Sequence, residues 1–337
     1  MNRKTKLPLG KVPIGILKKI LDYVDTDDSV LVPPGIGIDA AIVRSHDNII
    51  VSACDPITGA SREVGWLSVH VNANDIAACA ARPQWYIVTL LFPEDSGEEE
   101  IYETMRGIRQ GLREVGAVLV AGHTELTNKV KDTIVVGTMI GTPMVRGRYV
   151  SNKGAKVGDI IIMTKGAGIE GTWILAETFH DKLGLSEKEL ENIRKLKKMI
   201  SVLPDVKALI GIGVENIHAM HDATEGGLLG ALYEVAEASG VGFEVYEEDI
   251  VILEETQRIA ERLMVDPLKL ISSGTLIAVI DSRYSDMAIK ALRNRGIQAT
   301  VIGHITSGRR IIRRLDGGIV EIKEPPIDEL WRILGEG

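Results

Sequence analysis

Residues 66–81 combine the features of a buried helix with three polar side chains. The stretch is rich in small apolar residues, and Pro83 follows it as a helix terminator. Asn72 and Asp75 stand three residues apart and therefore share one face of the predicted helix, with Asn74 beside them. A carboxylate buried without a partner is costly, and a metal ion or a paired group is the usual compensation. A buried Asp that only caps a neighbouring loop is the alternative, and this stretch leaves both open.

The length and composition are those of a globular protein with two domains. A chain of 337 residues is long for one core, and 45% hydrophobic residues supply ample apolar material. The net charge of −8 argues against non-specific nucleic-acid binding, because a surface that contacts phosphates is normally basic. The first ten residues lack the apolar core of a signal peptide, and no apolar run approaches the ~18 residues of a membrane span. A cytoplasmic protein is therefore expected.

Two further features of the composition carry weaker expectations. Cys54 and Cys79 offer neither a disulfide framework nor a Cys-x-x-Cys metal pair, and each stands in an apolar run, so two buried thiols are predicted. Abundant Ile, Lys and Glu with only three Phe are compatible with a thermophilic source.

A glycine-rich loop precedes the first strand-like run of the chain. Gly35 and Gly37 allow a backbone to approach a ligand closely, and Asp39 follows immediately before the apolar residues. A bare Gly-x-Gly is also typical of an ordinary loop, so the pattern alone leaves both interpretations open.

Two short apolar runs, residues 48–53 and 118–121, predict buried strands followed by acidic groups. Asp55 follows the first run, and Glu125 follows the second in the sequence Gly-His-Thr-Glu. Because ligands gather at the carboxyl ends of strands in α/β architectures, we expect these acids to share one site. Carboxylates without a Cys/His set favour a hard ion, Mg²⁺ before Ca²⁺. Caps and turn residues are the alternative for all of the acids named so far.

The second half of the chain contains a literal Gly-x-Gly-x-x-Gly. Gly166, Gly168 and Gly171 stand between a predicted strand, residues 159–164, and a predicted helix. No second strand ending in an acid follows about twenty residues later, so a Rossmann-type dinucleotide site is not favoured. The glycines and the helix N-terminus instead favour a site for an anion such as a substrate phosphate.

A second polar segment surrounds Asp222. Asp222 and Glu225 precede an apolar helical run with the spacing of a capping box, which is the structural alternative to a role in metal binding. His218 and His221 stand three residues apart, but no third ligand is evident, so they are not assigned to a metal site. Both halves of the chain alternate strands and helices, which predicts a two-domain α/β (α+β) layout. We place the boundary at a turn-rich joint, giving domains 1–149 and 150–337.

Six short motifs occur in a fixed order along nearly the whole chain. They are Gly37-Ile-Asp39-Ala-Ala, Cys54-Asp55, Asn74-Asp75-Ile-Ala with Ala81-Arg-Pro83, Gly122-His-Thr-Glu125, Asp222-Ala-Thr-Glu-Gly-Gly-Leu228 and Asp266-Pro-Leu. Together they resemble the aminoimidazole ribonucleotide (AIR) synthetase, or PurM-like, superfamily. The resemblance is nearest to HypE-like hydrogenase expression/formation proteins and archaeal AIR-synthase-related proteins.

The resemblance implies a fold, a cofactor set and candidate residues. It implies an N-terminal domain whose strands join those of a partner in a homodimeric β-barrel, and a C-terminal α/β domain. ATP is expected between the domains, with Mg²⁺ bridging its phosphates to acidic residues. By motif, the metal ligands would be Asp39, Asp55, Asp75, Glu125 and Asp222. The nucleotide-binding residues would be Gly35, Gly37, Asn72, Asn74, Gly122, Thr124, Gly166, Gly168 and Gly171.

Departures from the family pattern leave the reaction open. HypE-type proteins end in Pro-Arg-Ile-Cys, whereas the given chain ends in Trp331-Arg-Ile-Leu-Gly-Glu-Gly337. The usual Gly-Asp-Asp-Ala-Ala is one acid short here. The expected function is an ATP-dependent, Mg²⁺-requiring enzyme that activates an amide or a small-metabolite oxygen by phosphoryl transfer. The alternative is a nucleotide-binding maturation scaffold that acts with a protein partner.

Overall fold

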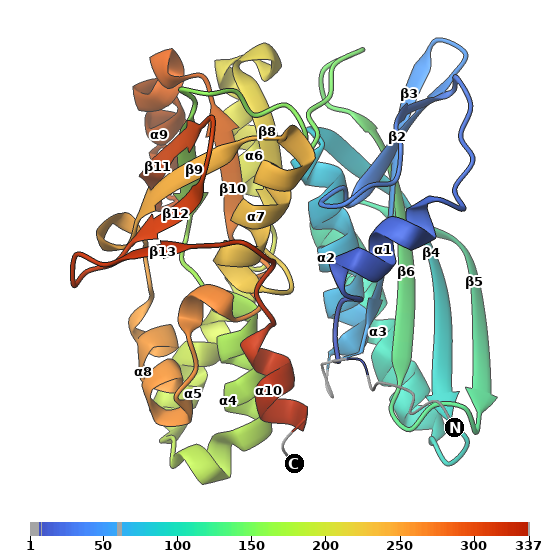
Figure 1. Cartoon of the computed structure of the whole chain (residues 1–337). Helices are drawn as coiled ribbons and strands as arrows, with labels where there is room; N and C mark the ends of the chain where they lie inside the picture. Colours follow the sequence, from blue (N-terminus) through green and yellow to red (C-terminus); the bar gives the residue numbers. More distant parts are fainter. Residues whose placement is uncertain (1–6, 8, 59–62, 336–337) are drawn as a thin grey trace, which may run out of the picture.

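A computed structural model shows two α/β units, each built on its own sheet (Figure 1). It describes residue 7 and residues 9–58 and 63–335. The prediction of no signal peptide concerns the first ten residues, and most of these lie outside this range. The last two residues of the cysteine-free tail also lie outside it. None of the helices in the described part has the length and apolar character that a membrane crossing requires. The predicted mixed α/β layout is confirmed.

The first sheet is formed by the first half of the chain. Its six strands follow the order β1-β2-β3-β6-β4-β5, and only β4 and β5 pair in parallel. The strands are β1 (Val30–Val32), β2 (Ala40–Ser45), β3 (Asn48–Ile57), β4 (Ala81–Pro93), β5 (Val118–Thr127) and β6 (Ile134–Pro143). The helices of this half are α1 (Ile14–Leu21), α2 (Val64–Ala78) and α3 (Glu98–Val115).

Helix α2 lies at the centre of the molecule. Every residue of α2 is buried, because one side packs on the first sheet and α3 while the other contacts the second domain (Figure 1). A helix that is apolar all round is expected to be covered all round. The predicted end at residue 81 is wrong, since Ala80 takes a left-handed conformation (φ 55°) and β4 begins at the next residue. Pro83 therefore lies within β4, beside an irregularity in its pairing with β6.

Two strands extend further than their apolar runs predict. β3 continues through Asp55, and β5 continues through Glu125. The prediction that these acids follow their strands is therefore wrong. The backbone pairing persists past the last apolar residue, with Asp55 opposite Gly137 of β6 and Glu125 opposite Leu91 of β4.

The second sheet contains seven strands in the order β13-β12-β9-β11-β7-β10-β8. Its strands are β7 (Ile160–Thr164), β8 (Ile217–Asp222), β9 (Gly242–Tyr246), β10 (Leu276–Ile280), β11 (Ala299–Thr306), β12 (Arg310–Arg313) and β13 (Ile319–Glu321). The helices are α4 (Ile169–Leu183), α5 (Glu187–Arg194), α6 (Leu203–Leu209), α7 (Gly227–Ser239), α8 (Glu254–Leu263), α9 (Ser285–Arg293) and α10 (Glu329–Gly335). β10 is buried along its whole length, which explains its uninterrupted apolar sequence.

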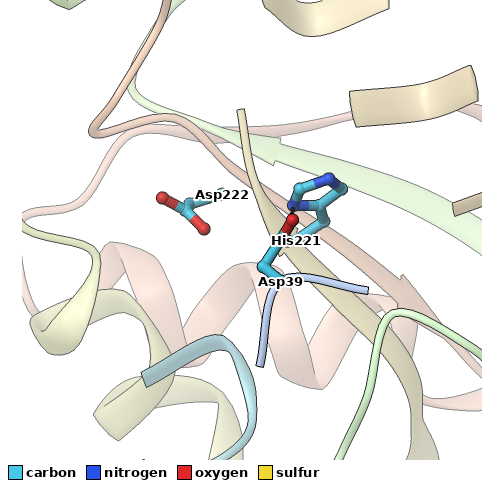
Figure 2. A group of neighbouring side chains, drawn as sticks. All are labelled: Asp39, His221 and Asp222. Atoms are coloured by element: carbon cyan, nitrogen blue, oxygen red, sulfur yellow. Dashed lines mark ion pairs between the residues drawn. The ribbon is translucent and has the colours of Figure 1, made fainter. Parts of the chain in front are cut away.

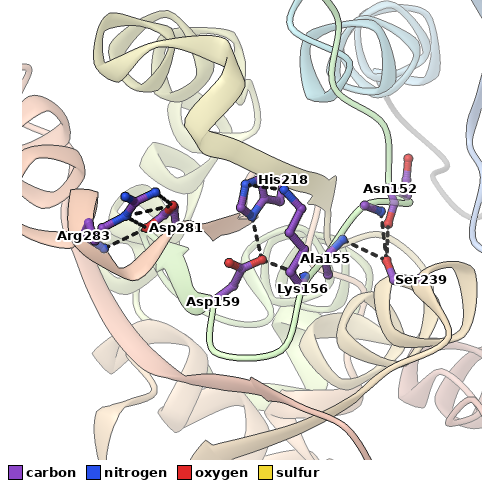
Figure 3. Close-up of polar contacts among 9 residues, drawn as sticks. Asn152, Ala155, Lys156, Asp159, His218, Ser239, Asp281 and Arg283 are labelled. Atoms are coloured by element: carbon purple, nitrogen blue, oxygen red, sulfur yellow. Dashed lines mark hydrogen bonds and ion pairs between the residues drawn. The ribbon is translucent and has the colours of Figure 1, made fainter.

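The segment between β6 and β7 contacts both domains, and Figure 3 shows its contacts with the second. Asn152 Nδ2 donates to Asp39 Oδ2 over 2.7 Å, and the Ser239 hydroxyl accepts two backbone N–H groups of the segment, at 3.1 and 3.2 Å. Further along, Asp159 Oδ2 lies 2.8 Å from His218 Nδ1 of β8. These contacts tie the segment to the residue before β2, to the last residue of α7 and to the start of β8.

Candidate acidic site between the two domains

A cavity of about 610 Å³ lies between the two domains. Three predicted metal ligands, Asp39, Asp55 and Asp75, line it from the first domain. The second domain contributes Glu170 and Ser273, together with apolar side chains. Three acids that lie far apart in the sequence therefore line one cavity.

Asn72 and Asp75 share one face of α2, as predicted, but their tasks differ. The Asp55 N–H donates to Asn72 Oδ1 at 3.0 Å, and Asn72 Nδ2 donates to the Asp55 carbonyl at 3.2 Å. Asn72 Nδ2 also donates to the Ser68 carbonyl at 2.8 Å. The amide of Asn72 is therefore used to hold the backbone of β3, and it positions Asp55 next to Asp75.

Asp222 stands at the end of β8, fully buried. The capping-box alternative is wrong, because α7 begins at Gly227 and its N-cap residue Gly226 has no capping side chain. The Gly226 N–H instead donates to Asp328 Oδ2 at 2.6 Å. Within the described residues, neither carboxylate oxygen of Asp222 has a hydrogen-bond partner.

The carboxylates lie close enough to alter one another's ionisation. Burial raises the pKa of Asp75 well above its ordinary value, and the charges of Asp55, Asp222 and Asp39 raise it further. Burial also raises the pKa of Asp222 to about 7, despite the opposing charge of a neighbouring histidine. Asp75 Oδ2, like the oxygens of Asp222, has no partner among the residues that the structure describes.

This donor set fits a hard divalent cation. Four carboxylates meet without enough positive charge to balance them, and three of their buried oxygens have no partner among the described residues. Buried carboxylates of this kind are normally paired or coordinate a metal. Oxygen ligands alone suit Mg²⁺ or Ca²⁺, so Asp39, Asp55, Asp75 and Asp222 are the residues that would hold a magnesium ion.

His221 is the site residue that the sequence argument missed. Its Nδ1 lies 2.9 Å from Asp39 Oδ2, and its Nε2 lies 2.8 Å from Glu234 Oε2. Burial lowers its pKa, but the charges of Asp39 and Glu234 outweigh burial and raise it to about 10. Figure 2 shows the ring facing Asp39, with Asp222 on the other side of the strand.

The position of His221 allows two roles. One ligand atom from each of Asp39, His221 and Asp222 lies within 4.8 Å of the other two, which is close enough to hold a metal. The two ring nitrogens also face the carboxylates of Asp39 and Glu234, so the ring orients Asp39. His218 lies away from this group, against Asp159.

Residues 9–12 of the amino-terminal segment line the cavity. Lys11 Nζ lies 2.8 Å from Glu234 Oε1, and the Lys11 N–H donates to Glu225 Oε1 at 2.7 Å. A second cavity of about 660 Å³ lies against the same segment, and Lys11 and Glu225 line both. Gly37 lines this second cavity; its φ is +68°, and a Cβ there would lie 2.5 Å from the Glu234 carbonyl.

Asn74 faces the second domain rather than the cavity. Its Nδ2 donates to the Ile200 carbonyl at 2.8 Å, and its Oδ1 accepts the Val202 N–H at 2.9 Å. Both groups of the amide are thereby used. Asn74 fastens α2 to the second domain.

The Gly-x-Gly-x-x-Gly loop packs against the protein itself. The Gly168 N–H donates to the Ser272 hydroxyl at 2.8 Å, and the Gly171 N–H donates to the Ile271 carbonyl at 2.9 Å. The Thr275 hydroxyl donates to the carbonyl of Gly166. These backbone groups are occupied, and the side chain that the loop brings to the cavity is Glu170.

The structure does not bring Glu125 to the other four acids within one chain. Asp55, Gly137, Val88 and Gly122 form one row across β3, β6, β4 and β5. Three strand spacings separate the ends of this row, about 14 Å, and Glu125 lies further along the same edge strand. Gly122 and Glu125 are exposed on that edge, as is Thr124.

The two cysteines differ in their surroundings. Cys79 is buried, as predicted, whereas Cys54 on β3 is exposed, so the prediction for Cys54 is wrong. Cys54 alternates along β3 with buried Ala53, which places it on the other face of the sheet.

Two family models match the chain in order. The AIR synthase related protein N-terminal domain matches residues 37–142, and the AIR synthase related protein C-terminal domain matches residues 156–316. A hydrogenase expression/formation protein of Methanocaldococcus jannaschii is 29% identical over 301 residues, which is 85% of this chain and 84% of that protein. A carbamoyl dehydratase HypE of Cupriavidus necator is 27% identical over 278 residues, 81% and 76% of the two chains.

Solved structures share the fold at low sequence identity. A chain of the HypE–HypF complex superposes with a TM-score of 0.76 at 22% identity, covering 93% of this chain and 100% of that one. A hydrogenase maturation protein HypE in complex with ATP gives a TM-score of 0.70 at 21% identity, covering 94% and 91%. The predicted PurM-like fold is confirmed. By both of its domain matches, the chain belongs to the family of AIR synthase related proteins.

Proposed function

We propose that this protein is an ATP-dependent, Mg²⁺-requiring enzyme that transfers a phosphoryl group from ATP to an oxygen of an amide or small metabolite, with ADP as the leaving group. The observation that carries the proposal is the meeting of Asp39, Asp55, Asp75 and Asp222 beside the interdomain cavity, with buried oxygens that lack partners among the described residues. When bound, Mg²⁺ neutralises phosphate charge as the phosphoryl group moves.

The chain's own residues would hold and orient this site. Burial raises the pKa of Asp39, but the charges of His221 and Lys11 outweigh burial and hold it well below its usual range, so Asp39 is ionised. Asn72 fixes the backbone of Asp55 next to Asp75. The segment around Lys11 lines the cavity and would help to exclude water from bound phosphates.

Similarity to known proteins supports the proposal that this protein binds ATP. The fold is shared with a HypE that was solved in complex with ATP. We place the phosphates at the four carboxylates and the remainder of the nucleotide along the amino-terminal segment, beside the second cavity and the loop that carries Gly35 and Gly37. Gly37 is among the residues that line that cavity.

The proposal includes a homodimer. Strand β5 is an edge strand that exposes Val118, Val120 and Leu126, and Trp85 of β4 is exposed beside it. An exposed apolar edge is normally covered by another chain. The predicted roles of Gly122, Thr124 and Glu125 depend on such a second copy, since these residues lie far from the acids of their own chain.

Asp75→Asn tests the metal-site assignment. In calorimetry, the wild-type protein should bind ATP only when Mg²⁺ is present, and it should convert ATP to ADP. The Asp75→Asn protein should bind Mg·ATP at least a hundredfold more weakly. Asp95→Asn, an exposed acid of the same domain, is the control and should behave as wild type. Mg·ATP hydrolysis retained in a well-folded Asp75→Asn protein would refute the assignment.

The second candidate is a nucleotide-binding maturation scaffold that acts with a protein partner. It is favoured by the shared fold with a chain of the HypE–HypF complex and by the relative named as a hydrogenase expression/formation protein. Steady-state ATP consumption by the purified protein alone would count against this candidate.

A further inference from the structure

One part of the acidic site combines a ring nitrogen with two carboxylates. His221 and Asp222 are the last two residues of β8, and both are fully buried. One ligand atom from each of Asp39, His221 and Asp222 lies within 4.8 Å of the other two, and neither Asp55 nor Asp75 belongs to this group. The group is therefore a separate position within the site, and it contains a nitrogen donor as well as carboxylate oxygens.

The separation between His221 and Asp39 matches that of neighbouring metal ligands. Nδ1 of His221 lies 2.9 Å from Oδ2 of Asp39. Two ligand atoms that bond to one ion at about 2.1 Å and at right angles lie about 3 Å apart. Asp222 completes the group, since neither of its carboxylate oxygens has a hydrogen-bond partner among the described residues. A buried carboxylate in that state normally pairs with a charge or coordinates a metal.

The other nitrogen of the ring is held as it is in metal-binding histidines. Nε2 of His221 lies 2.8 Å from Oε2 of Glu234, a residue of α7. Glu234 is itself fixed, because its Oε1 lies 2.8 Å from Nζ of Lys11. A metal-bound histidine usually donates its second N–H to a carboxylate, which fixes the ring and directs the remaining nitrogen toward the ion. Glu234 occupies the position of that supporting carboxylate.

Nδ1 of His221 can carry a proton or a metal ion, but not both. Burial lowers the pKa of His221, but the charges of Asp39 and Glu234 outweigh burial and raise it to about 10. The carboxylates that favour this proton also favour a metal ion, and a divalent cation brings twice the charge. A cation that binds between Asp39 and Asp222 would therefore displace the proton from Nδ1.

The nitrogen donor determines which ions suit this position. Mg²⁺ prefers oxygen ligands alone, whereas imidazole together with carboxylates suits transition ions. We propose that Asp39, His221 and Asp222 hold a divalent first-row transition ion, beside a Mg²⁺ ion at Asp55 and Asp75. This inference rests on the proposed function, because it names one of the ions at the site that would hold the phosphates.

Pulsed electron paramagnetic resonance of Mn²⁺ bound to the full chain tests the nitrogen ligand directly. The spin-echo modulation should show one directly bound nitrogen, and labelling of histidine with ¹⁵N in the wild-type protein should change that coupling. His221→Asn should abolish the coupling. His218→Asn is the matched control on the same strand; the ring of His218 lies against Asp159, and its replacement should leave the coupling unchanged.

Calorimetry with Mn²⁺ and Mg²⁺, each without nucleotide, tests the selectivity. His221→Asn should lower the affinity for Mn²⁺ about tenfold more than the affinity for Mg²⁺, because only the transition ion gains from the imidazole. Glu234→Gln retains the side-chain shape but removes the charge that supports the ring, and it should weaken Mn²⁺ binding about tenfold or more. His218→Asn should change neither affinity.

The outcomes separate this inference from the proposed function. Folded protein that binds no Mn²⁺, a bound Mn²⁺ without a histidine nitrogen coupling, or an unchanged Mn²⁺ to Mg²⁺ preference in His221→Asn would overturn the inference. Mg·ATP binding that requires Asp75, measured in the same preparations, would then leave the proposed function standing. A histidine nitrogen coupling in protein that binds no Mg·ATP would refute the proposed function and support a transition-metal site at His221.

Discussion

Replacing Glu170 with Gln should stabilise the protein in a pH-dependent manner. Burial raises the pKa of Glu170 from 4.5 to about 7, and Asp328 and Asp222 add to the effect. The folded state therefore holds this proton more tightly than the unfolded state does. The resulting stability is complete below pH 4.5 and is lost as the pH rises through 7. The difference of 2.5 in pKa corresponds to about 3 kcal/mol at pH 8, and about 1 kcal/mol is already lost at pH 5.

The assay compares free energies of unfolding in guanidinium chloride at pH 5 and pH 8. Glutamine does not titrate, so the stability of Glu170→Gln relative to wild type should grow by about 2 kcal/mol between the two pH values. Any pH-independent effect of the new amide cancels in this comparison. Glu177→Gln, the control on the same helix, should keep its difference from wild type within about 0.5 kcal/mol at both pH values. A Glu170→Gln difference that is the same at pH 5 and pH 8 would refute the reasoning.

Three further substitutions test other parts of the structure. Asn72→Ala removes the amide that holds the backbone of Asp55, so calorimetry should show Mg·ATP binding at least tenfold weaker. Lys165→Met leaves Asp205, 3.0 Å from the Lys165 ammonium, buried without its cation, and chemical denaturation should show a loss of about 3–5 kcal/mol. Val120→Lys places a charge on the exposed edge strand β5, and sedimentation should show a monomer in place of the expected dimer.

For each of these three substitutions, one result would contradict the prediction. Wild-type Mg·ATP affinity in Asn72→Ala would show that the clamp on β3 does not position the site. A Lys165→Met protein as stable as wild type would contradict a structural role for the buried pair. A wild-type protein that is monomeric at all concentrations would remove the basis for the dimer, and a dimeric Val120→Lys protein would place the interface elsewhere.

Local patterns in the sequence predicted much of the fold. Apolar residues recur at helical spacing along residues 101–115, which form most of α3, and Gly116, with φ +78°, is the left-handed residue that ends it. The small apolar residues along 66–81 predicted a buried helix, and every residue of α2 is buried. The ends of β3 and β5 could not be predicted, because pairing with neighbouring strands carries the backbone past the polar residues that end each apolar run.

The sequence by itself determined that acids in apolar settings would need a common counter-charge, because an isolated buried carboxylate is too costly to keep. The tertiary structure decided which acids share that site: Asp39, Asp55, Asp75 and Asp222 meet, while Glu125 lies three strands away from Asp55. It also decided the roles of the remaining polar groups. Adjacent residues on a strand or helix point to different partners, and only the packing of the two domains specifies what those partners are.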